Sequence, residues 1–348
     1  MTRSTRPDLN RRTVLAAGGG LSLAALLAAC GSGSGGSAAG PSGAGATSST
    51  SGEWTFTDDR NKKITEKSTP QRVVAFTGTA AALWDFGVRD SIVGVFGETK
   101  LPDGSATPLA GDLDLSKVTI IGNAYGQFDL EKFLSTNPDL LATDAYTPNE
   151  LWYVPAGSVS KIEAVAPTLA INTAWVSMIK PIEKHQQLAA ALGADQNAAD
   201  VTAAKKRFDA AAQAVRDAVK ANPGITVLAC SAATDIFYAS NPKYAADLIY
   251  FASLGVQFVQ PTKLDKGDYF QSLSWENAGT YPADILLLDN RSTSLQPKDL
   301  TGNAAWTALP AVKADQVTGW DTVPRFSYAG VAPNLERLAA AIKTAKKL

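Results

Sequence analysis

Imidazole and sulfur side chains are scarce in this chain. Its 348 residues include one histidine, His185, and two cysteines, Cys30 and Cys230. A single histidine cannot build a zinc or manganese site that relies on several imidazole ligands. A Ser-His-Asp hydrolase would need that histidine beside a serine, and the sequence has no nucleophile-elbow motif. His185 stands in the polar stretch Ile182–Leu188, which predicts a solvent-exposed position on a helix.

An excess of one charge and long apolar runs are lacking as well. Lys and Arg total 32 against 33 Asp and Glu, which gives a formal net charge of -1. This balance provides no electrostatic footprint for nucleic acid. After residue 30, no apolar segment is long enough to cross a bilayer. The hydrophobic share of 45% is that of a globular protein, and the chain is longer than one core usually holds, which suggests two lobes.

Residues 1–29 have the pattern of an export signal. Arg11 and Arg12 precede a short apolar run that ends in Leu27–Cys30. Paired arginines, an apolar stretch too short to span a bilayer and small residues at a cleavage site are typical of secretion, and the arginine pair favours the twin-arginine route over the general one. The run Leu27–Cys30 resembles the lipobox of a bacterial lipoprotein, so we expect Cys30 to carry lipid. An uncleaved anchor helix and an unmodified cysteine are the alternatives.

Residues 30–53 are dominated by glycine, serine, alanine and threonine. Such a segment cannot bury apolar surface, which predicts a flexible tether with a root-mean-square reach of roughly 25 Å. With lipid on Cys30, the protein would lie on the outer face of the cytoplasmic membrane, held there by the lipid alone. Cys230 would then have no disulfide partner, so packing alone must hold the folded part together.

From Trp54 on, extended and helical patterns alternate. Trp54–Thr57 and Lys62–Thr65 flank a polar turn and predict a small hairpin. Residues 54–196 are expected to form a first lobe, in which continuous apolar strands alternate with helices and indicate a parallel sheet covered on both faces. The predicted strands are Arg72–Phe76, Ser91–Val95, Thr119–Ile121, Asp139–Ala142 and Thr168–Ile171, and the predicted helices are Ala80–Phe86, Asp129–Thr136 and Val159–Ala164.

Residues 197–221 break this alternation. Ala, Lys, Arg and Gln dominate them and Asn222–Gly224 ends the run, which predicts one helix roughly 35 Å long. Strands resume in residues 222–348, the expected second lobe. They are Ile225–Ala229, Val256–Val259, Asp284–Leu288 and Gln316–Gly319, before a closing helix at Asn334–Lys347. The predicted fold class is α/β: two Rossmann-like βα lobes with central, mainly parallel sheets, joined by one long rigid helix, with a ligand cleft between the lobes.

Several segments, none diagnostic by itself, occur in a characteristic order. They are Pro70–Ala75, Phe86–Val88, Ile92–Val95, Asp129–Phe133, Pro138–Leu141, Ile162–Thr168, Leu188–Gly193, Leu273–Glu276, Ala283–Ile285 and Trp306–Val317. In order and spacing, the chain from about residue 70 to its end resembles the iron-siderophore and cobalamin substrate-binding proteins of ABC importers, a group with the class III periplasmic-binding fold. The resemblance implies a monomeric, non-enzymatic protein that captures a ferric siderophore and delivers it to a permease.

Two glutamates stand at matching places in these segments. Glu131 precedes Pro138-Asp139 in the first lobe, and Glu276 precedes Ala283-Asp284 in the second. The resemblance implies that each docks into an arginine pocket of the permease, a task suited to exposed carboxylates at the rim of an interface. The alternative is that both are ordinary glutamates in the first turn of a helix, where the helix dipole favours negative charge.

Ligands of open α/β sheets bind beyond the carboxyl ends of the strands, so the loops that follow the strands are candidate contacts. Most of these loops carry an aromatic residue and two carry arginine. The candidate ligand-binding residues are Tyr125, Tyr146, Trp152, Trp175, Phe237, Tyr238, Tyr269, Arg291, Trp320 and Arg325. Aromatic faces and arginine forks suit a bulky organic ligand with an oxygen-rich iron centre. The chelator would supply the iron ligands, so no resident cofactor or protein-bound metal is expected.

Alternatives remain open at several positions. Trp152 and Trp175 could be core residues. Arg291 could instead form an ion pair with Asp289, and Arg325 with Asp321. Because the candidate set is aromatic with few arginines, a hydroxamate siderophore is favoured over strongly anionic types. Cobalamin or haem is the alternative ligand, and an exported hydrolase or a surface receptor is the alternative function.

Overall fold

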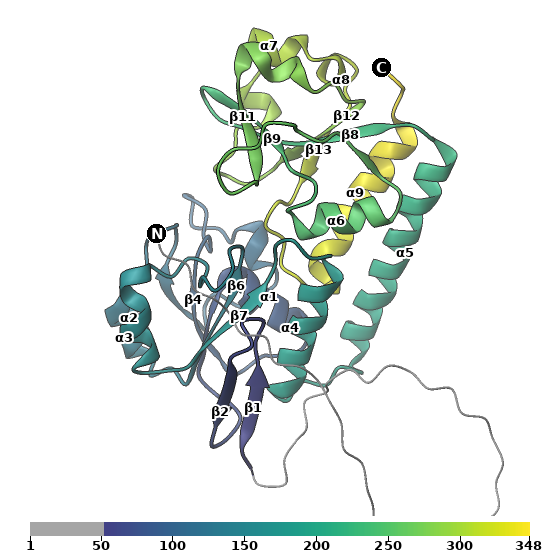
Figure 1. Ribbon diagram of the computed structural model, residues 1–348. Coiled ribbons are helices and arrows are strands. Elements are labelled where there is room, and N and C mark those ends of the chain that lie inside the picture. Colours follow the sequence, from purple (N-terminus) through teal and green to yellow (C-terminus); the bar gives the residue numbers. More distant parts are fainter. Residues whose placement is uncertain (1–51) are drawn as a thin grey trace, which may run out of the picture. The chain divides into compact units, whose positions relative to one another are not determined.

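The computed structural model describes residues 52–348, which belong to one compact unit (Figure 1). The predicted signal peptide, the lipid on Cys30 and all of the predicted tether except residues 52 and 53 lie outside the described residues. Among the helices of residues 52–348, none combines the length and the hydropathy needed to cross a membrane.

The first lobe is built on a five-stranded sheet in the order β5-β4-β3-β6-β7, and all of its pairings are parallel, as predicted. The predicted hairpin is also present, with β1 (Trp54–Thr57) antiparallel to β2 (Lys63–Glu66). The sheet strands are β3 (Val73–Phe76), β4 (Ile92–Phe96), β5 (Thr119–Gly122), β6 (Leu140–Ala145) and β7 (Thr168–Asn172). The helices are α1 (Thr77–Asp85), α2 (Leu130–Ser135), α3 (Val159–Glu163) and α4 (Ile179–Ala191).

The second lobe contains a six-stranded mixed sheet. Its main order is β11-β9-β8-β12-β13, with β10 beside the start of β8. Strands β8, β10, β12 and β13 pair in parallel, whereas β9 and β11 are antiparallel and were not predicted. The strands are β8 (Thr226–Ala232), β9 (Ile236–Ser240), β10 (Gln257–Phe258), β11 (Phe270–Ser274), β12 (Ile285–Asp289) and β13 (Val317–Trp320). The helices are α6 (Ala246–Ser253), α7 (Ala304–Ala308), α8 (Pro310–Lys313) and the 3-10 helix η3 (Trp275–Thr280).

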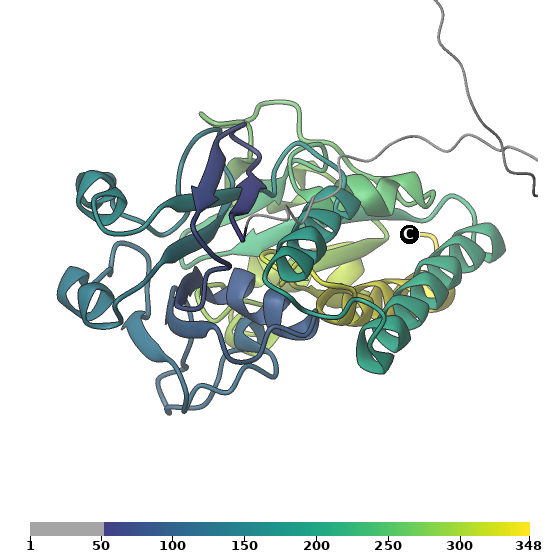
Figure 2. The same cartoon turned by 90° about the horizontal axis from the view of Figure 1, so that it is seen from below.

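One long helix carries the chain from the first lobe to the second, as predicted, and a second helix packs along it. The predicted connector is α5 (Ala199–Ala221), and α9 (Tyr328–Thr344) packs along it (Figures 1 and 2). A bidentate ion pair links them, with Nε and Nη2 of Arg207 each 2.7 Å from a carboxylate oxygen of Glu336. Helix α9 begins before the predicted start at Asn334, because the side chain of Ser327 accepts a hydrogen bond from Gly330 N and caps the helix there.

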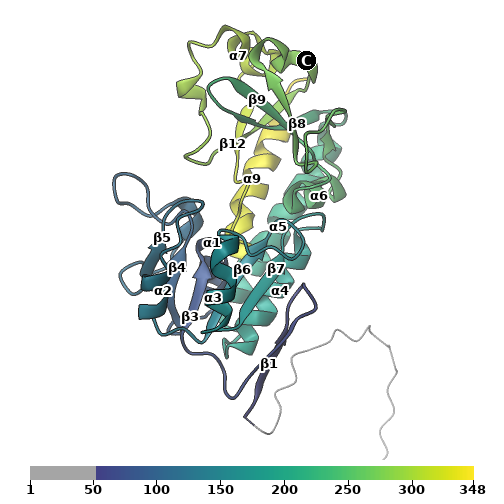
Figure 3. The same cartoon turned by 60° about the vertical axis from the view of Figure 1, so that its left-hand side comes forward.

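Helices lie on both sides of the first-lobe sheet (Figure 3), and the core follows from the alternation of side chains along each strand. In the first lobe, Val73 and Ala75 face α1 and α4, while Val74 and Phe76 face α2 and α3 on the other side of the sheet. In the second lobe, one sheet face packs against α6 and α9, and the other packs against α7 and α8. The apolar layer that contains α5 and α9 is continuous from one lobe to the other. Shared packing of this kind holds the lobes together, and no disulfide links them within residues 52–348.

Backbone hydrogen bonds also join the lobes directly. The segment after β7 runs antiparallel to the start of α6, with an isolated bridge between Ala174 and Ala245. Trp175 N donates to the Tyr244 carbonyl at 2.8 Å, and Met178 N donates to the Ala246 carbonyl at 2.9 Å. These bonds fix the first-lobe strand ends against the second lobe at one side of the cleft.

A buried ion pair joins the lobes at a second place. Nε of Arg325, in the segment before α9, lies 3.2 Å from Oδ2 of Asp85 at the end of α1, and Ser327 Oγ donates to the same carboxylate. The Arg325 guanidinium lies against Gly111 in the first lobe, where φ is +54° and a Cβ atom would stand 1.2 Å from Nη1. Only glycine leaves room for this approach. Arg325 therefore serves as an interlobe contact.

Candidate ligand-binding site

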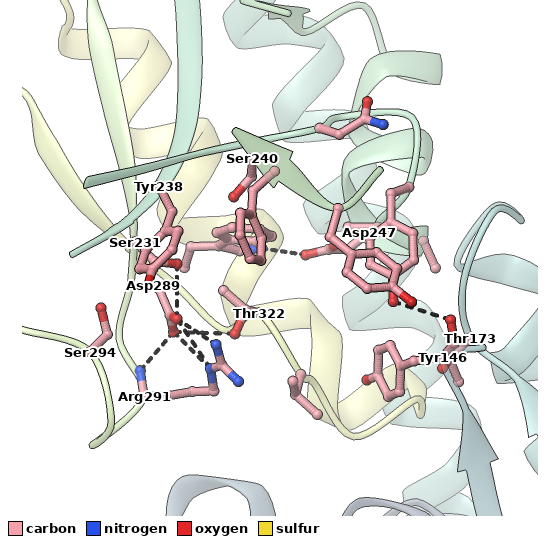
Figure 4. A pocket seen from close by; sticks show the side chains of 18 of the residues that line it. Tyr146, Thr173, Ser231, Tyr238, Ser240, Asp247, Asp289, Arg291, Ser294 and Thr322 are labelled. Atoms are coloured by element: carbon pink, nitrogen blue, oxygen red, sulfur yellow. Dashed lines mark hydrogen bonds and ion pairs between the residues drawn. The ribbon is translucent and has the colours of Figure 1, made fainter. Parts of the chain in front are cut away.

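A cavity of about 450 Å³ lies between the two lobes (Figure 4). Its walls are the carboxyl ends of β6, β8, β12 and β13 together with β9, the start of α6 and the segment before α9. This is the position expected for a ligand of two parallel sheets that face each other. Most of the lining residues belong to the second lobe, and the first lobe contributes Tyr146, Thr147, Trp152 and Thr173.

The first-lobe wall is aromatic and uncharged. The rings of Tyr146 and Trp152 contact each other with their centroids 4.7 Å apart. Burial raises the pKa of Tyr146 well above its ordinary value, and the nearby carboxylate of Asp144 acts in the same direction, so the phenol keeps its proton. Within residues 52–348, neither the Tyr146 hydroxyl nor Trp152 Nε1 makes a well-aligned hydrogen bond, although the Thr173 hydroxyl is close enough to Tyr146 to oppose part of the rise in its pKa. The wall thus carries two buried donors that a ligand oxygen could satisfy.

The second-lobe wall contains a neutralised ion pair. Asp289 is fully buried at the end of β12, and Nη2 of Arg291 lies 2.7 Å from its Oδ2. Ser231 Oγ and Thr322 Oγ1 also donate to this carboxylate, at 3.0 and 3.2 Å. Arg291 Nη1 bonds to none of the described residues, and the side chain is about one-third exposed. The arginine can therefore hold Asp289 and still offer a donor to the cavity.

A second carboxylate, Asp247, lies elsewhere on the same wall (Figure 4). It stands in the first turn of α6 with 2% of its surface exposed. Trp320 Nε1 donates to its Oδ2 at 2.5 Å, and Leu248 N donates to its Oδ1 at 2.9 Å. Burial raises the pKa of Asp247 to about 7, although both hydrogen bonds oppose the shift.

Tyrosines close the rim of the cavity across the two lobes. Tyr244 donates from its hydroxyl to the Tyr146 carbonyl at 3.2 Å, and Tyr269 lies 3.2 Å from the Thr147 hydroxyl. The rings of Tyr244 and Tyr269 are 4.3 Å apart, centroid to centroid. These contacts bind the rim of one lobe to the rim of the other.

Six of the ten predicted ligand-binding residues line this cavity. They are Tyr146, Trp152, Tyr238, Tyr269, Arg291 and Trp320. Arg291 also makes the ion pair with Asp289 that was the alternative for it, so the two interpretations are compatible. Trp152 is partly buried against the core and lines the cavity as well.

Phe237 does not line this cavity, which corrects the prediction that it contacts the ligand, whereas Arg325 lies between the lobes but outside this cavity. Phe237 is fully buried in the core of the second lobe, because it belongs to a strand and alternates with Tyr238, which faces the cavity. Arg325 lines a neighbouring cavity of about 370 Å³ and pairs with Asp85, whereas the predicted partner, Asp321, pairs with Arg337.

Tyr125 and Trp175 are exposed aromatic residues that border the cavity without lining it. Tyr125 is 66% exposed, and its ring centroid lies 5.7 Å from that of Trp152. Trp175 is 47% exposed, has a positive φ of 59° and packs edge-on against Tyr244. Each extends the aromatic surface of a lining residue outward, so Trp175 is not a core residue.

Asp247, Tyr244 and several hydroxyl groups also line the cavity, although none of them was predicted. Asp247 interrupts the otherwise apolar run Ala245–Phe251, and a lone carboxylate inside such a run was a usable signal. The hydroxyls of Ser231 and Thr322 gave no signal, because their roles depend on the partner that the fold brings to them.

The prediction that His185 is exposed is wrong. The ring is fully buried, since Ile182, His185 and Leu188 share the face of α4 that packs into the core. Its Nδ1 lies 2.7 Å from the Pro181 carbonyl, which only accepts, so Nδ1 carries a proton. Nε2 lies 3.2 Å from Oδ1 of Asp144, without the alignment of a hydrogen bond.

This buried pair lies directly behind the cavity. The His185 ring stacks at 6.2 Å on Phe326, which lines the cavity, and Asp144 is two residues before Tyr146. Thr79 donates to the same oxygen of Asp144 at 3.0 Å. The hydrogen bond from Thr79 therefore anchors the end of β6, from which Tyr146 projects, and His185 packs beside it. Within residues 52–348, no three His, Cys, Asp or Glu side chains converge as they would around a metal ion.

Comparison with known proteins identifies the architecture. The sequence profile described as periplasmic binding protein matches residues 73–324. The chain belongs to the periplasmic binding protein family. Its structure superposes with a TM-score of 0.81 on DesE, a ferric-siderophore receptor protein from Streptomyces coelicolor, which is 44% identical over 85% of this chain and 99% of that chain. No curated protein sequence matches the chain.

More distant structures share the fold alone. The petrobactin-binding protein YclQ from Bacillus subtilis is 18% identical over 84% of this chain and 99% of its own, with a TM-score of 0.61. The siderophore periplasmic binding protein from the fuscachelin gene cluster of Thermobifida fusca is 18% identical over 79% of this chain and 96% of its own, with a TM-score of 0.54. As a periplasmic binding protein, the chain is an extracytoplasmic transport component and not an enzyme.

In this periplasmic binding protein, the two predicted docking glutamates are exposed at the surface of different lobes. Glu131 lies in the first turn of α2, which Asp129 caps by accepting a hydrogen bond from Lys132 N. Glu276 lies in the first turn of η3, a 3-10 helix. Hydrogen bonds from its own backbone N–H and from Ser274 lower the pKa of Glu276, which keeps it ionised. Both carboxylates are accessible to a partner.

Proposed function

We propose that this protein captures a ferric siderophore, most favourably of the hydroxamate type, and delivers it to the permease of an ABC importer. The observation that carries the proposal is the interlobe cavity, in a chain that is 44% identical to a ferric-siderophore receptor along 99% of that receptor. Cavities of roughly 300–1,000 Å³ are typical of small-molecule sites, and this one falls within the range.

The charge of the lining favours hydroxamate over catecholate chelates. Asp289 neutralises Arg291, and Asp247 adds a further carboxylate. A ferric tris-catecholate carries several negative charges and would require an excess of cations around it, because buried charges must be paired. A ferric tris-hydroxamate centre is neutral, so it brings no further negative charge into this lining.

Unsatisfied donors point toward an oxygen-rich chelate. The Tyr146 hydroxyl, Trp152 Nε1 and Arg291 Nη1 are free to donate to ligand oxygens. The iron is part of the transported substrate, and the oxygens of the chelator would be its ligands. The protein would contact only the organic part of the complex. The exposed ring of Tyr125 beside Trp152 would support the part of the ligand that extends beyond the cavity.

Delivery would use the two exposed glutamates. Glu131 and Glu276 lie one on each lobe. A permease with two arginine pockets at the matching separation would bind both carboxylates at once. Lipid on Cys30 would keep the folded part near the membrane. Replacing both glutamates by Ala is expected to abolish uptake of the iron chelate while leaving its affinity unchanged; unchanged uptake would contradict the docking role.

The ligand class is tested by adding candidate ligands to the protein and measuring the quenching of its tryptophan fluorescence. The panel is a ferric trihydroxamate, the same chelator without iron, a ferric tris-catecholate, cobalamin and haem. Quenching that saturates at the lowest concentration with the ferric trihydroxamate supports the proposal. Tight binding of cobalamin or haem, with no response to any ferric chelate, would overturn the siderophore assignment.

A further inference from the structure

The cavity wall carries one more anion than cation. Its carboxylates are Asp247 and Asp289, and among the described lining residues Arg291 is its one cation. The guanidinium of Arg291 is committed to Asp289, 2.7 Å away. Asp247 has no cationic partner in the described part of the chain, since its hydrogen bonds come from Trp320 and Leu248. The charge on Asp247 is therefore the uncompensated one.

We infer that Asp247 makes this cavity select ferric siderophores that bear a cationic group over otherwise identical neutral ones. The inference rests on the proposed function, because it concerns which siderophore the same cavity prefers. It adds to that function a charge selectivity that depends on one carboxylate of the cavity wall.

The hydrogen bonds around Asp247 stabilise its ionised form. An indole N–H and a backbone N–H can only donate, so both partners require an acceptor oxygen on the carboxylate. With 2% of its surface exposed, Asp247 is poorly screened by water, and its field extends into the cavity. Figure 4 shows Asp247 well apart from the Asp289–Arg291 pair, so the arginine does not cancel that field.

The other ionisable groups around Asp247 do not compensate it. Asp321, which follows Trp320, is paired with Arg337 at 2.5 Å. Tyr146, across the cavity, is a neutral phenol because burial raises its pKa well above the ordinary value. The negative charge of Asp321 raises the pKa of Asp247, as burial does. A cationic group on the ligand would therefore be the counter-charge that this wall lacks.

The pH dependence follows from the same geometry. Burial raises the pKa of Asp247 to about 7, so its charge is present above this pH and lost below it. The preference for a cationic ligand should therefore fade as the pH decreases from 8.5 to 5.5. A primary amine on the ligand stays protonated across this range, since its pKa is about 10.

The experiment compares two linear ferric trihydroxamates that differ in one group, a free terminal amine against the same amine acetylated. Dissociation constants are measured with the full chain at pH 8.5 and pH 5.5. At pH 8.5 the amine form is expected to bind about tenfold more tightly, the order of one weakly screened charge pair. At pH 5.5, and in Asp247→Asn at either pH, the ratio should fall to near one. Ser240→Ala, an uncharged change in the same lining, should keep the wild-type ratio at each pH.

The outcomes separate this inference from the proposed function. If both chelates bind and their affinity ratio is near one at pH 8.5, or if Asp247→Asn keeps the wild-type ratio, Asp247 does not set the selectivity. If neither chelate binds, the proposed function itself fails.

A second variant covers the case in which Asp247→Asn does not fold. Trp320→Phe removes the indole N–H that stabilises the ionised form of Asp247. The pKa of Asp247 should therefore rise, and the pH at which selectivity is lost should rise with it. An unchanged pH midpoint in this variant would overturn the inference.

Discussion

The two lobes supply different chemistry to the cavity. The first lobe contributes Tyr146 and Trp152, uncharged rings with free donors, whereas Asp247, Asp289 and Arg291 all come from the second. The sheets differ as well, since the first is fully parallel and the second is mixed. The antiparallel strands of the second sheet present lining residues that loops alone would not provide. The uncharged ligand contacts therefore lie on the first lobe and the charged ones on the second. Substitutions in one lobe can test each set separately.

The largest expected effect concerns β9, where neighbours point to opposite faces. Phe237→Ala should lower the free energy of unfolding by about 3–5 kcal/mol, because it leaves a cavity in a packed core. Urea denaturation followed by circular dichroism measures this. The matched change, Tyr238→Ala, removes a half-buried lining ring and should weaken ligand binding with a much smaller loss of stability. Equal stability losses would contradict the assignment of the two faces.

A smaller effect is expected from breaking the second lobe's ion pair. Asp289→Asn leaves Arg291 without its counter-charge and should cost about 2–3 kcal/mol of unfolding free energy, less than for a fully buried pair because Arg291 is partly exposed. Asp321→Asn is the control, since its pair with Arg337 is more solvated and should be worth less than about 1 kcal/mol. Chemical denaturation of both variants decides the order, and a larger loss in Asp321→Asn would be inconsistent with the proposed neutralisation.

The smallest expected effect concerns the uncharged first-lobe wall and its hydrogen bond to the ligand. Trp152→Phe keeps a ring beside Tyr146 but removes Nε1, so affinity for a ferric trihydroxamate should fall by about three- to tenfold, the value of one hydrogen bond. Stability should change little, because Nε1 has no partner within residues 52–348. Isothermal titration calorimetry measures the affinity. Unchanged affinity would mean that the indole donor does not reach the ligand.

The comparison of the lobes also shows what sequence could predict. Buried parallel strands such as Val73–Phe76 and Ile285–Asp289 are continuous apolar runs, and they were found within a residue or two of their ends. Strands β9 and β11 are partly exposed and lack a continuous apolar run, so their patterns are weaker and they were not predicted. Phe237 was misplaced for that reason, because only strand geometry separates it from Tyr238.

Candidate site residues were predictable where their position at the end of a strand is enough to place them in the cavity wall. Trp320 ends β13 and Arg291 lies two residues after the end of β12, and both line the cavity. Arg325 could not be assigned, because its partner Asp85 is 240 residues away along the chain and in the other lobe. His185 was misjudged because its immediate neighbours are polar, whereas the helical spacing Ile182, His185, Leu188 marks a buried face.

The location of the iron tests the central claim most directly. Crystals of the full chain with a ferric trihydroxamate would be measured at the iron absorption edge. We predict one anomalous peak inside the interlobe cavity, between the Tyr146–Trp152 wall and Arg291, with every iron ligand supplied by the chelator. An iron peak outside this cavity, or iron bound directly by protein oxygen atoms, would contradict the account.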